Sequence, residues 1–305
     1  MNRILVTGGT GFLGKSLCTD LHSIGMVHAV NSSMYDLTDY VSTEQMYKDF
    51  KPNIVVHLAA TVGGIGANKI NPGLFIDNNL SMGSNVIRLA KKYNVDKFVM
   101  IGTVCSYPKN CPVPFKEEDI WNGYPEETNA PYGIAKKTLM QMVQSYHQQY
   151  GFNGLNLIPV NMYGPHDNFD PKSSHVIPAL ILKFQNAIND HIDDVEIWGT
   201  GTASREFLYV DDCANAIKLA IQHYNSPDFI NIGTGSEITI YDLAYKIKRL
   251  MGYDGNIVFN KDYPDGQPRR CLNISRAKNR LSWTPKVTLD EGLKNTIEWY
   301  RKNYE

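Results

Sequence analysis

The sequence predicts an α/β protein in which helices cover both faces of a doubly wound parallel sheet, with a smaller C-terminal α/β lobe. Short, continuous apolar runs alternate with longer helical patterns through the first half of the chain. Strands that are apolar on both faces are typical of parallel sheets, because crossover helices bury both sides. After about residue 162, loops rich in Gly, Pro and Asp become frequent. We therefore expect a first domain over residues 1–162, to which some later segments return, and a second lobe over residues 163–305.

The expected elements follow one another in a regular order. The apolar runs that predict strands lie at residues 4–6, 27–30, 54–58, 98–101 and 155–160. Helical patterns follow the strands at residues 12–24, 43–50, 73–93 and 131–150, and further helices are expected at 174–190, 211–224, 239–251 and 289–303. This alternation builds βαβ units, so the first domain should have a Rossmann-type plan.

Composition excludes several classes of partner. The 305 residues include 30 Lys plus Arg and 31 Asp plus Glu, so nothing in the charge favours nucleic acid or an anionic membrane surface. No apolar stretch approaches the ~18 residues of a membrane span. The five cysteines contain no CxxC pair. We therefore expect no metal site and no disulfide framework, and a cytoplasmic location.

A glycine-rich segment stands between the first strand and the first helix. Gly8, Gly11 and Gly14 are spaced three apart in the sequence Thr-Gly-Gly-Thr-Gly-Phe-Leu-Gly. In this position the first glycine permits a tight turn, the second lets backbone approach a pyrophosphate, and the third lets the helix pack close to the strand. A glycine-rich turn without a ligand is the alternative, but the place between strand and helix favours a dinucleotide site. Its residues are Gly8, Gly9, Thr10, Gly11, Phe12, Leu13 and Gly14.

The end of the second strand bears on which dinucleotide binds. Val30 is followed by Asn31, Ser32 and Ser33. An acidic residue there would bind the ribose 2′-hydroxyl of NAD, and an arginine would bind the 2′-phosphate of NADP. Neither is present, but a serine hydroxyl can donate to a phosphate. We therefore expect NADP(H), with Ser32 as a contact, and keep NAD(H) as the alternative.

Tyr132 and Lys136 predict an acid–base pair. They are four residues apart on an expected helix and so face the same side. An ammonium near a phenol should lower the pKa of Tyr132 towards working pH, which suits a group that gives a proton to a carbonyl oxygen receiving hydride. Thr103 follows an expected strand end and can hydrogen-bond the same oxygen. An exposed Tyr/Lys pair is the alternative; the glycine motif and Thr103 together favour catalysis.

Together these features resemble the extended short-chain dehydrogenase/reductase superfamily. Longer motifs give a closer resemblance, to the GDP-L-fucose synthase family, and they run through essentially the whole chain in order. They are HLAATVGGI at 57–65, CSYP at 105–108, YGPHDNF at 163–169, SHVIP at 174–178, WGTGT at 198–202, REFLYVDD at 205–212 and PDGQPRR at 264–270.

This resemblance implies two epimerisations and one reduction of a GDP-linked 4-keto sugar, with GDP-4-keto-6-deoxy-D-mannose giving GDP-L-fucose. A 4-ketone acidifies the protons on C3 and C5. By resemblance, Cys105 is the base, His175 is the acid, and Tyr132 gives the last proton to the C4 oxygen. A thiol and an imidazole titrate near neutral pH, which suits both roles. Taken alone, Cys105 is more often a small buried apolar residue, and His175 a surface histidine.

The resemblance also implies an assembly and further ligand contacts. Members of this family form dimers, so we expect a homodimer packed through the helices at 73–93 and 131–150. Departures from the family pattern are Thr103, where a serine is frequent, and the absence of a basic residue in the first loop. The implied cofactor contacts include Leu58, Ala59, Ala60, Lys136, Pro159, Asn161, Met162 and His175, and the implied GDP contacts are Lys183, Trp198, Arg205, Asp265 and Arg270.

Four alternatives stay open at this point. A 4,6-dehydratase would carry an acidic pair after the threonine, where this chain has Val104 and Cys105. A simple 4-epimerase would need only the Tyr/Lys pair and would leave Cys105 and His175 unexplained. A non-catalytic cofactor sensor would have no need of the intact catalytic set. A reductase or epimerase/reductase of a related sugar, such as a heptose or a dideoxy sugar, would use the same residues.

Overall fold

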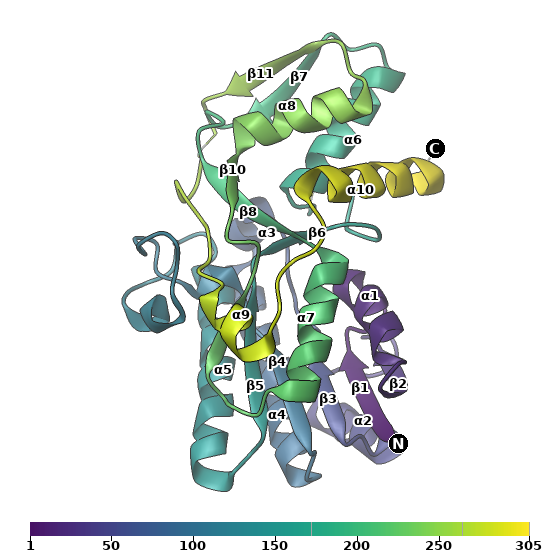
Figure 1. Ribbon diagram of the computed structural model, residues 1–305, viewed down its shortest axis with the longest axis vertical. Coiled ribbons are helices and arrows are strands. Elements are labelled where there is room, and N and C mark those ends of the chain that lie inside the picture. Colours follow the sequence, from purple (N-terminus) through teal and green to yellow (C-terminus); the bar gives the residue numbers. More distant parts are fainter. Residues whose placement is uncertain (172, 264, 305) are drawn as a thin grey trace.

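The computed structural model describes residues 1–171, 173–263 and 265–304. Its largest sheet has the strand order β2-β1-β3-β4-β5-β9, and every neighbouring pair is parallel. Helices cover both faces of this sheet in the lower part of the molecule (Figure 1). The predicted fold class is thereby confirmed. The strands are β1 (Asn2–Thr7), β2 (Gly25–Val30), β3 (Ile54–His57), β4 (Lys97–Ile101), β5 (Gly154–Pro159) and β9 (Phe229–Ile232).

The order of the strands places one ligand-binding edge. From β1 the chain moves outward to β2 and then returns to the other side of β1 as β3, so the winding direction reverses there. In such sheets ligands bind beyond the carboxyl ends of the strands at this reversal. The last residues of β1 and β3, Thr7 and His57, are register partners. The segments that follow them, at 8–14 and 58–60, therefore start side by side.

The helices around this sheet form two packed groups. The helices α1 and α7 contact each other, and α4 contacts both α5 and α2. Two short 3₁₀ helices, η1 (Val104–Ser106) and η2 (Glu117–Trp121), follow β4. The helices are α1 (Phe12–Leu21), α2 (Tyr40–Phe50), α3 (Ile65–Ile70), α4 (Pro72–Lys92), α5 (Ala130–Tyr150), α7 (Val210–His223) and α9 (Ser275–Leu281).

The upper part of the molecule is a smaller lobe with two small sheets (Figure 1). One sheet has the order β10-β8-β6 and the other pairs β11 with β7. These strands were not predicted from the sequence. They are β6 (Asn161–Tyr163), β7 (Asp194–Trp198), β8 (Ser204–Tyr209), β10 (Glu237–Thr239) and β11 (Asn256–Asn260), and the helices packed with them are α6 (Val176–Asn189), α8 (Ile240–Met251) and α10 (Leu289–Tyr304).

Two apolar cores support the two parts. The larger core lies around the parallel sheet and includes Val55 and Phe98, together with Ile217 of α7 and Ile230 of β9. The smaller core lies among α6, α8 and α10 and includes Phe184. Later segments of the chain thus join the first core. Within the described ranges, no helix is both long and apolar enough to cross a membrane.

Candidate active site

The glycine-rich segment forms a narrow turn between β1 and α1. Gly8 has a φ of +68°, a conformation that L side chains rarely adopt, and a Cβ there would lie 2.9 Å from the backbone nitrogen of Ala59. Gly14 lets α1 pack directly against the backbone of Gly8 and Gly9. Gly11 is the N-cap residue of α1, and no side-chain cap hydrogen bond is made at that end. The first N–H groups of the helix are therefore available to an anion.

The segment after β3 borders this turn. The backbone nitrogens of Leu58 and Ala59 lie 3.1 Å from the Thr7 carbonyl oxygen and 3.4 Å from the Thr7 Oγ1, respectively. The Thr7 hydroxyl also lies 2.8 Å from His57 Nδ1. Burial, and then the charge of Lys136, lower the pKa of His57 to about 3. The ring is therefore neutral, and residues 58 and 59 lie against the end of β1, where the glycine-rich turn begins.

The loop after β2 is organised by a residue that our sequence analysis did not single out. Asn31 Oδ1 accepts hydrogen bonds from the Ser33 backbone N–H and hydroxyl at 3.1 and 2.7 Å, and its amide donates to Thr10 Oγ1 at 3.4 Å. This side chain ties the loop to the glycine turn. Ser32 is exposed at the tip, with neither an acidic residue nor an arginine beside it in the sequence. The exposed position of Ser32 and the absence of a neighbouring carboxylate leave room for the 2′-phosphate of NADP.

These features fit a dinucleotide. A side chain at Gly8 or Gly14 would collide with backbone, so these glycines let the turn, the segment after β3 and the start of α1 pack closely together. The free start of α1 suits a pyrophosphate. Further along the sheet edge, Pro159 ends β5, and Asn161 and Met162 lie in β6. Asn161 is fixed by donating from Nδ2 to the Glu206 carbonyl oxygen at 3.1 Å.

Lys136 is buried in α5 beneath this edge. It is 2% exposed, and its ammonium donates to the Ile101 carbonyl oxygen at 3.1 Å. Burial lowers the pKa of Lys136 to about 8. The helix therefore carries an amine that exchanges protons close to neutral pH, directed at the carboxyl end of β4.

Tyr132 lies one turn earlier on the same helix, and its pKa corrects one expectation. Burial raises the pKa of Tyr132 well above its usual range, and the neighbouring Cys105 raises it further, while a hydrogen bond with Thr103 lowers it. The prediction that Lys136 lowers the pKa of Tyr132 is therefore wrong. Desolvation outweighs any help from the ammonium, which points to Ile101 instead. The phenol keeps its proton, which is the form that a proton donor needs.

Thr103 and Cys105 both follow β4: Thr103 is the N-cap residue of η1, and Cys105 lies within η1. Thr103 is 8% exposed, and its Oγ1 accepts the backbone N–H of Cys105 at 3.2 Å. A Cβ at Gly133 would collide with the Cys105 carbonyl oxygen, so the glycine between Tyr132 and Ile134 lets α5 touch this turn. Ser106 also donates to the Gly133 carbonyl oxygen at 2.9 Å. The fold thus brings the threonine, the cysteine and the tyrosine into one cluster.

Two arginines from the second lobe reach this cluster. Arg270 is 8% exposed, and its guanidinium donates to Cys105 Sγ at 3.6 Å. Arg205 donates to the carbonyl oxygens of Gln267 and Asp265 at 2.6 and 3.1 Å. Burial, followed by the charge of Arg270, lowers the pKa of Arg205 to about 10, and Cys105 opposes this change. The predicted GDP contacts Arg205 and Arg270 therefore lie beside the predicted catalytic cysteine.

The other predicted GDP contacts lie around the end of β7. The Lys183 ammonium lies 5.6 Å from the centre of the Trp198 ring, and it donates to the Glu196 carbonyl oxygen at 2.7 Å. Trp198 is 58% exposed. Asp265 accepts hydrogen bonds at 2.7 Å from both the backbone nitrogen and the hydroxyl of Thr200, so it fixes the turn after this tryptophan.

His175 comes from a separate element. It is the N-cap residue of α6, and its side chain makes no cap hydrogen bond. The side chain is exposed, yet surrounding protein lowers its pKa by desolvating the charged form. The imidazole ring is therefore surrounded by protein and open to solvent on one side. Among the hydrogen bonds between described residues, none joins this ring to Cys105 or Tyr132.

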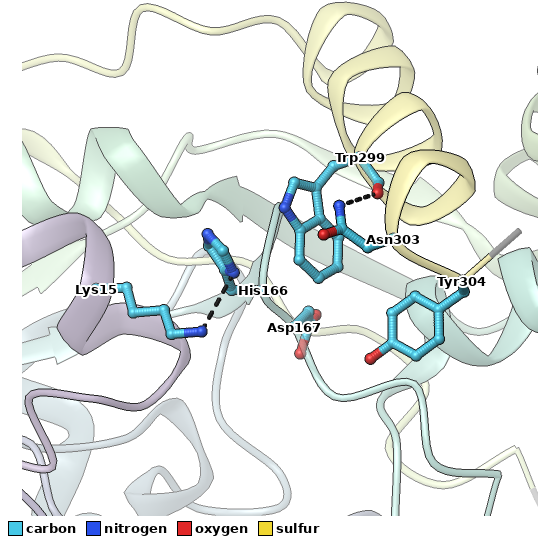
Figure 2. Close-up of a pocket in the computed structure, with 6 residues that line it drawn as sticks. All are labelled: Lys15, His166, Asp167, Trp299, Asn303 and Tyr304. Atoms are coloured by element: carbon cyan, nitrogen blue, oxygen red, sulfur yellow. Dashed lines mark hydrogen bonds between the residues drawn. The ribbon is translucent and has the colours of Figure 1, made fainter.

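A separate hollow lies between the lobes (Figure 2). Its described lining consists of Lys15, His166, Asp167, Trp299, Asn303 and Tyr304. The Lys15 ammonium lies 3.3 Å from His166 Nδ1, which directs this lysine to the hollow. Burial raises the pKa of Asp167 to about 7. The described lining includes none of the predicted catalytic residues, so the hollow is distinct from the cluster around Cys105.

Comparisons with known proteins agree with this arrangement. Residues 4–233 match the NAD dependent epimerase/dehydratase family. Over 304 residues the chain is 40% identical to probable GDP-L-fucose synthase 1 of Oryza sativa subsp. japonica, covering 99% of this chain and 92% of the relative.

Two solved structures are similar over nearly all of both chains. A GDP-6-OMe-4-keto-L-xylo-heptose reductase from C. jejuni has a TM-score of 0.92 at 30% identity, covering 99% of this chain and 98% of that chain. A GDP-L-fucose synthetase from Naegleria fowleri bound to NADP has a TM-score of 0.91 at 27% identity, covering 99% and 94%. The chain therefore belongs to the NAD dependent epimerase/dehydratase family and, within it, to the group of GDP-L-fucose synthases that its motifs indicate.

Proposed function

We propose that this chain catalyses the 3,5-epimerisation and NADPH-dependent 4-reduction of GDP-4-keto-6-deoxy-D-mannose, giving GDP-L-fucose. The observation that carries the proposal is the position of Cys105 beside Thr103 and Tyr132. A plain 4-reductase needs the hydroxyls of Thr103 and Tyr132 and has no use for a half-buried thiol next to them. The likeness to a GDP-L-fucose synthase at 40% identity supports the same activity.

In the epimerisation, the 4-ketone acidifies the protons on C3 and C5. Cys105, as a thiolate, takes one proton at a time from the carbon, and the electron pair moves into the carbonyl as an enolate. His175, as an imidazolium, returns a proton to the same carbon from the opposite face. Each inversion needs a base and an acid on two sides of the sugar ring, and these residues come from different elements, η1 and the start of α6.

In the reduction, bound NADPH would supply the hydride that C4 receives. Tyr132 gives its proton to the C4 oxygen, and the Thr103 hydroxyl hydrogen-bonds that oxygen. The raised pKa of Tyr132 keeps the phenol protonated until this step. Lys136, whose pKa is lowered to about 8 by burial, can then restore a proton. Both halves of the chemistry thus act on substituents of one sugar ring.

The cofactor is NADP(H), held by the glycine turn, the 58–60 segment and the loop around Ser32. The exposed tip of that loop carries no carboxylate to repel a 2′-phosphate. The NADP-bound relative from Naegleria fowleri supports this choice. For the nucleotide of the substrate, the exposed Trp198, whose ring stacks on Tyr263 with the ring centres 4.3 Å apart, could extend this stack to a base or sugar, and the cations at 183, 205 and 270 suit a diphosphate.

A second candidate is a 4-reductase of a GDP-linked heptose. The likeness to the heptose reductase from C. jejuni favours it. A pure reductase of that kind would leave the configuration at C3 and C5 unchanged. Cys105 beside Tyr132 favours the first proposal over this one.

The assembly and the domain boundary are also proposals. A homodimer would pack through α4 and α5, which lie against each other along the outside of the sheet. The first domain would comprise residues 1–162 with α7, β9 and α9 returning to it, which the shared apolar core supports. Sedimentation of the purified chain tests the dimer.

The function is tested by incubating the chain with NADPH and a panel of GDP-4-keto sugars. We expect NADPH absorbance at 340 nm to fall fastest with GDP-4-keto-6-deoxy-D-mannose, and NMR to identify GDP-L-fucose as the product. Consumption of NADPH with a heptose substrate alone would favour the second candidate. No consumption with any 4-keto sugar would contradict both.

A further inference from the structure

The guanidinium of Arg270 has a partner that its expected role does not explain. It donates to the Cys105 sulfur at 3.6 Å, and its Nε donates to Gln267 Oε1 at 3.2 Å. Gln267 is itself buried and donates to the carbonyl oxygen of Lys109 at 2.8 Å. Lys109 follows Cys105 by four residues. The glutamine therefore anchors Arg270 to the same loop that carries the cysteine, and so fixes the guanidinium against the sulfur.

The charges around this contact are unbalanced. A buried cation is costly unless it has an anionic partner. Among the described residues, no carboxylate forms an ion pair with Arg270, whereas the adjacent and exposed Arg269 pairs with Glu237. Within the described part of the chain, Arg270 contacts the Cys105 sulfur, and Arg205 and Tyr132 lie close enough to interact with it electrostatically. Two are cations and the third is a neutral phenol, so the sulfur lies where a negative charge is favoured.

We propose that Arg270 is a positioning residue that holds Cys105 as a thiolate and directs it, through Gln267, into the active site. A thiolate is a far stronger base than a thiol, and an adjacent guanidinium favours it. This role of Arg270 rests on the proposed function, because it explains how Cys105 becomes the base of the epimerisation. The ion pair itself exists in the protein without substrate and can be measured there.

The remaining cysteines leave the measurement clear. Burial raises the pKa of Cys18 to about 11 and, as the main cause, those of Cys111, Cys213 and Cys271 to about 12. These four stay protonated thiols below pH 9. A thiolate signal in that range therefore belongs to Cys105.

The test measures the rate of iodoacetamide labelling of Cys105 from pH 5 to pH 9 by peptide mass spectrometry, with thiolate absorbance at 240 nm as a second readout. The full chain is used without substrate, and Cys105→Ser gives the background. We expect Arg270→Gln to move the labelling transition upward by about one pH unit or more, so that the rate at pH 7 falls roughly tenfold. Arg270→Lys should restore part of the shift, because it keeps the charge. Arg269→Gln should match the wild type.

Circular dichroism and NADPH binding establish that each variant is folded. If Arg270→Gln does not fold, Arg270→Lys serves as the test variant, because its shorter and differently shaped head group should still move the labelling transition. A labelling transition identical in wild type, Arg270→Gln and Arg270→Lys would overturn the inference. So would a loss of GDP affinity in Arg270→Gln with no change in labelling, because Arg270 would then serve only the diphosphate. These results are independent of turnover. If the chain moves no proton at C3 or C5 but the transition still shifts, the proposed function fails and the ion pair stands.

Discussion

The reducing half and the epimerising half of the proposed site are held in different ways. Tyr132 and Lys136 lie one turn apart on a single long helix, α5, and Lys136 is buried beneath the sheet edge. Cys105 and His175 come from η1 and from the start of α6; Cys105 is half-buried and His175 is exposed. Proton donation to one oxygen needs one fixed direction, which a rigid helix supplies. Inversion of a carbon needs groups on two faces, so it draws on two separate elements.

The strongest test of this difference removes the phenol. Tyr132→Phe should lower 4-reduction by about 10²-fold or more, the usual contribution of a positioned acid. Exchange of the C3 and C5 protons with solvent should continue, because Cys105 and His175 are untouched. Stopped-flow absorbance at 340 nm measures the reduction, and NADPH fluorescence verifies binding. Near-normal reduction in this variant would remove Tyr132 from its role.

The converse change is Cys105→Ser. We expect exchange of the C3 and C5 protons to fall by roughly ten- to a hundredfold, since a serine hydroxyl is a much weaker base than a thiolate. NADPH should bind as before, and slow reduction of the unepimerised ketone should give a sugar of different stereochemistry. Deuterium exchange followed by NMR checks both points. If exchange in the variant equals that of the wild type, the thiol is structural and Cys105 is not the base of a separate epimerising half.

A smaller effect is expected from His175→Asn. Some proton removal should remain, but inverted product should fall by about tenfold, because no acid returns a proton from the second face. Desolvation by burial lowers the pKa of His175 from its usual value of 6.5, and the acid form is lost as pH rises through that lowered pKa, so inversion in the wild type should slow as pH rises from the acidic range towards neutral. The slope should be absent in the variant. A wild-type rate of inversion that does not change with pH would show that another group returns the proton.

The cofactor loop offers a change outside both halves. Ser32→Asp should shift the ratio of kcat/KM for NADPH and NADH towards NADH by about tenfold, because a carboxylate repels the 2′-phosphate and accepts from the 2′-hydroxyl. Ser33→Asp is a neighbouring control whose hydroxyl is already bonded to Asn31. Both catalytic halves should respond only through cofactor binding. A wild-type enzyme that prefers NADH would show that the loop has been misinterpreted.

The smallest effect concerns the segment that leads to His175. Burial raises the pKa of Asp167 from 3.8 to about 7, so the folded chain holds a proton that the unfolded chain releases. Stability should therefore fall as pH rises from about 4 to about 7. Asp167→Asn should remove this slope and be more stable at pH 8 by roughly 1–3 kcal/mol. Urea unfolding at several pH values measures this. A variant less stable than the wild type at pH 8 would mean that the hydrogen bond which Asp167 Oδ1 accepts from the Asn168 backbone N–H at 2.7 Å outweighs the cost of burying the charge.

The sequence predicted the parallel sheet well and the second lobe poorly, for a physical reason. The runs at residues 4–6, 54–56 and 98–101 are continuously apolar and buried, so they are recognisable as strands of a sheet that is covered on both faces. β9 is interrupted by Asn231, whose buried side chain bonds the carbonyl oxygens of Phe115 and Asn273. Those partners lie far away in sequence, so the strand was not predicted. The short strands of the second lobe carry few apolar residues between loops.

For the site, the glycine spacing and the Tyr132/Lys136 spacing come from local geometry and were recognisable. Cys105 and His175 came only from resemblance to a family, since neither has a local signature. Asn31, Gly133 and Gln267 were missed because they act on backbone or on other side chains. Only Gly133 carried a signal, as a glycine inside a helix between two predicted catalytic residues, where a close backbone approach is needed.

The central claim is that both halves act in turn on one sugar. It is tested most directly by running the wild-type reaction with NADPH and GDP-4-keto-6-deoxy-D-mannose in D₂O and locating deuterium in the product by NMR. We predict a GDP-L-fucose that carries deuterium at C3 and C5 and, at C4, the hydrogen transferred from NADPH. A reduced product without deuterium at C3 and C5, still in the D-configuration, would contradict the account and leave a 4-reductase in which Cys105 is structural.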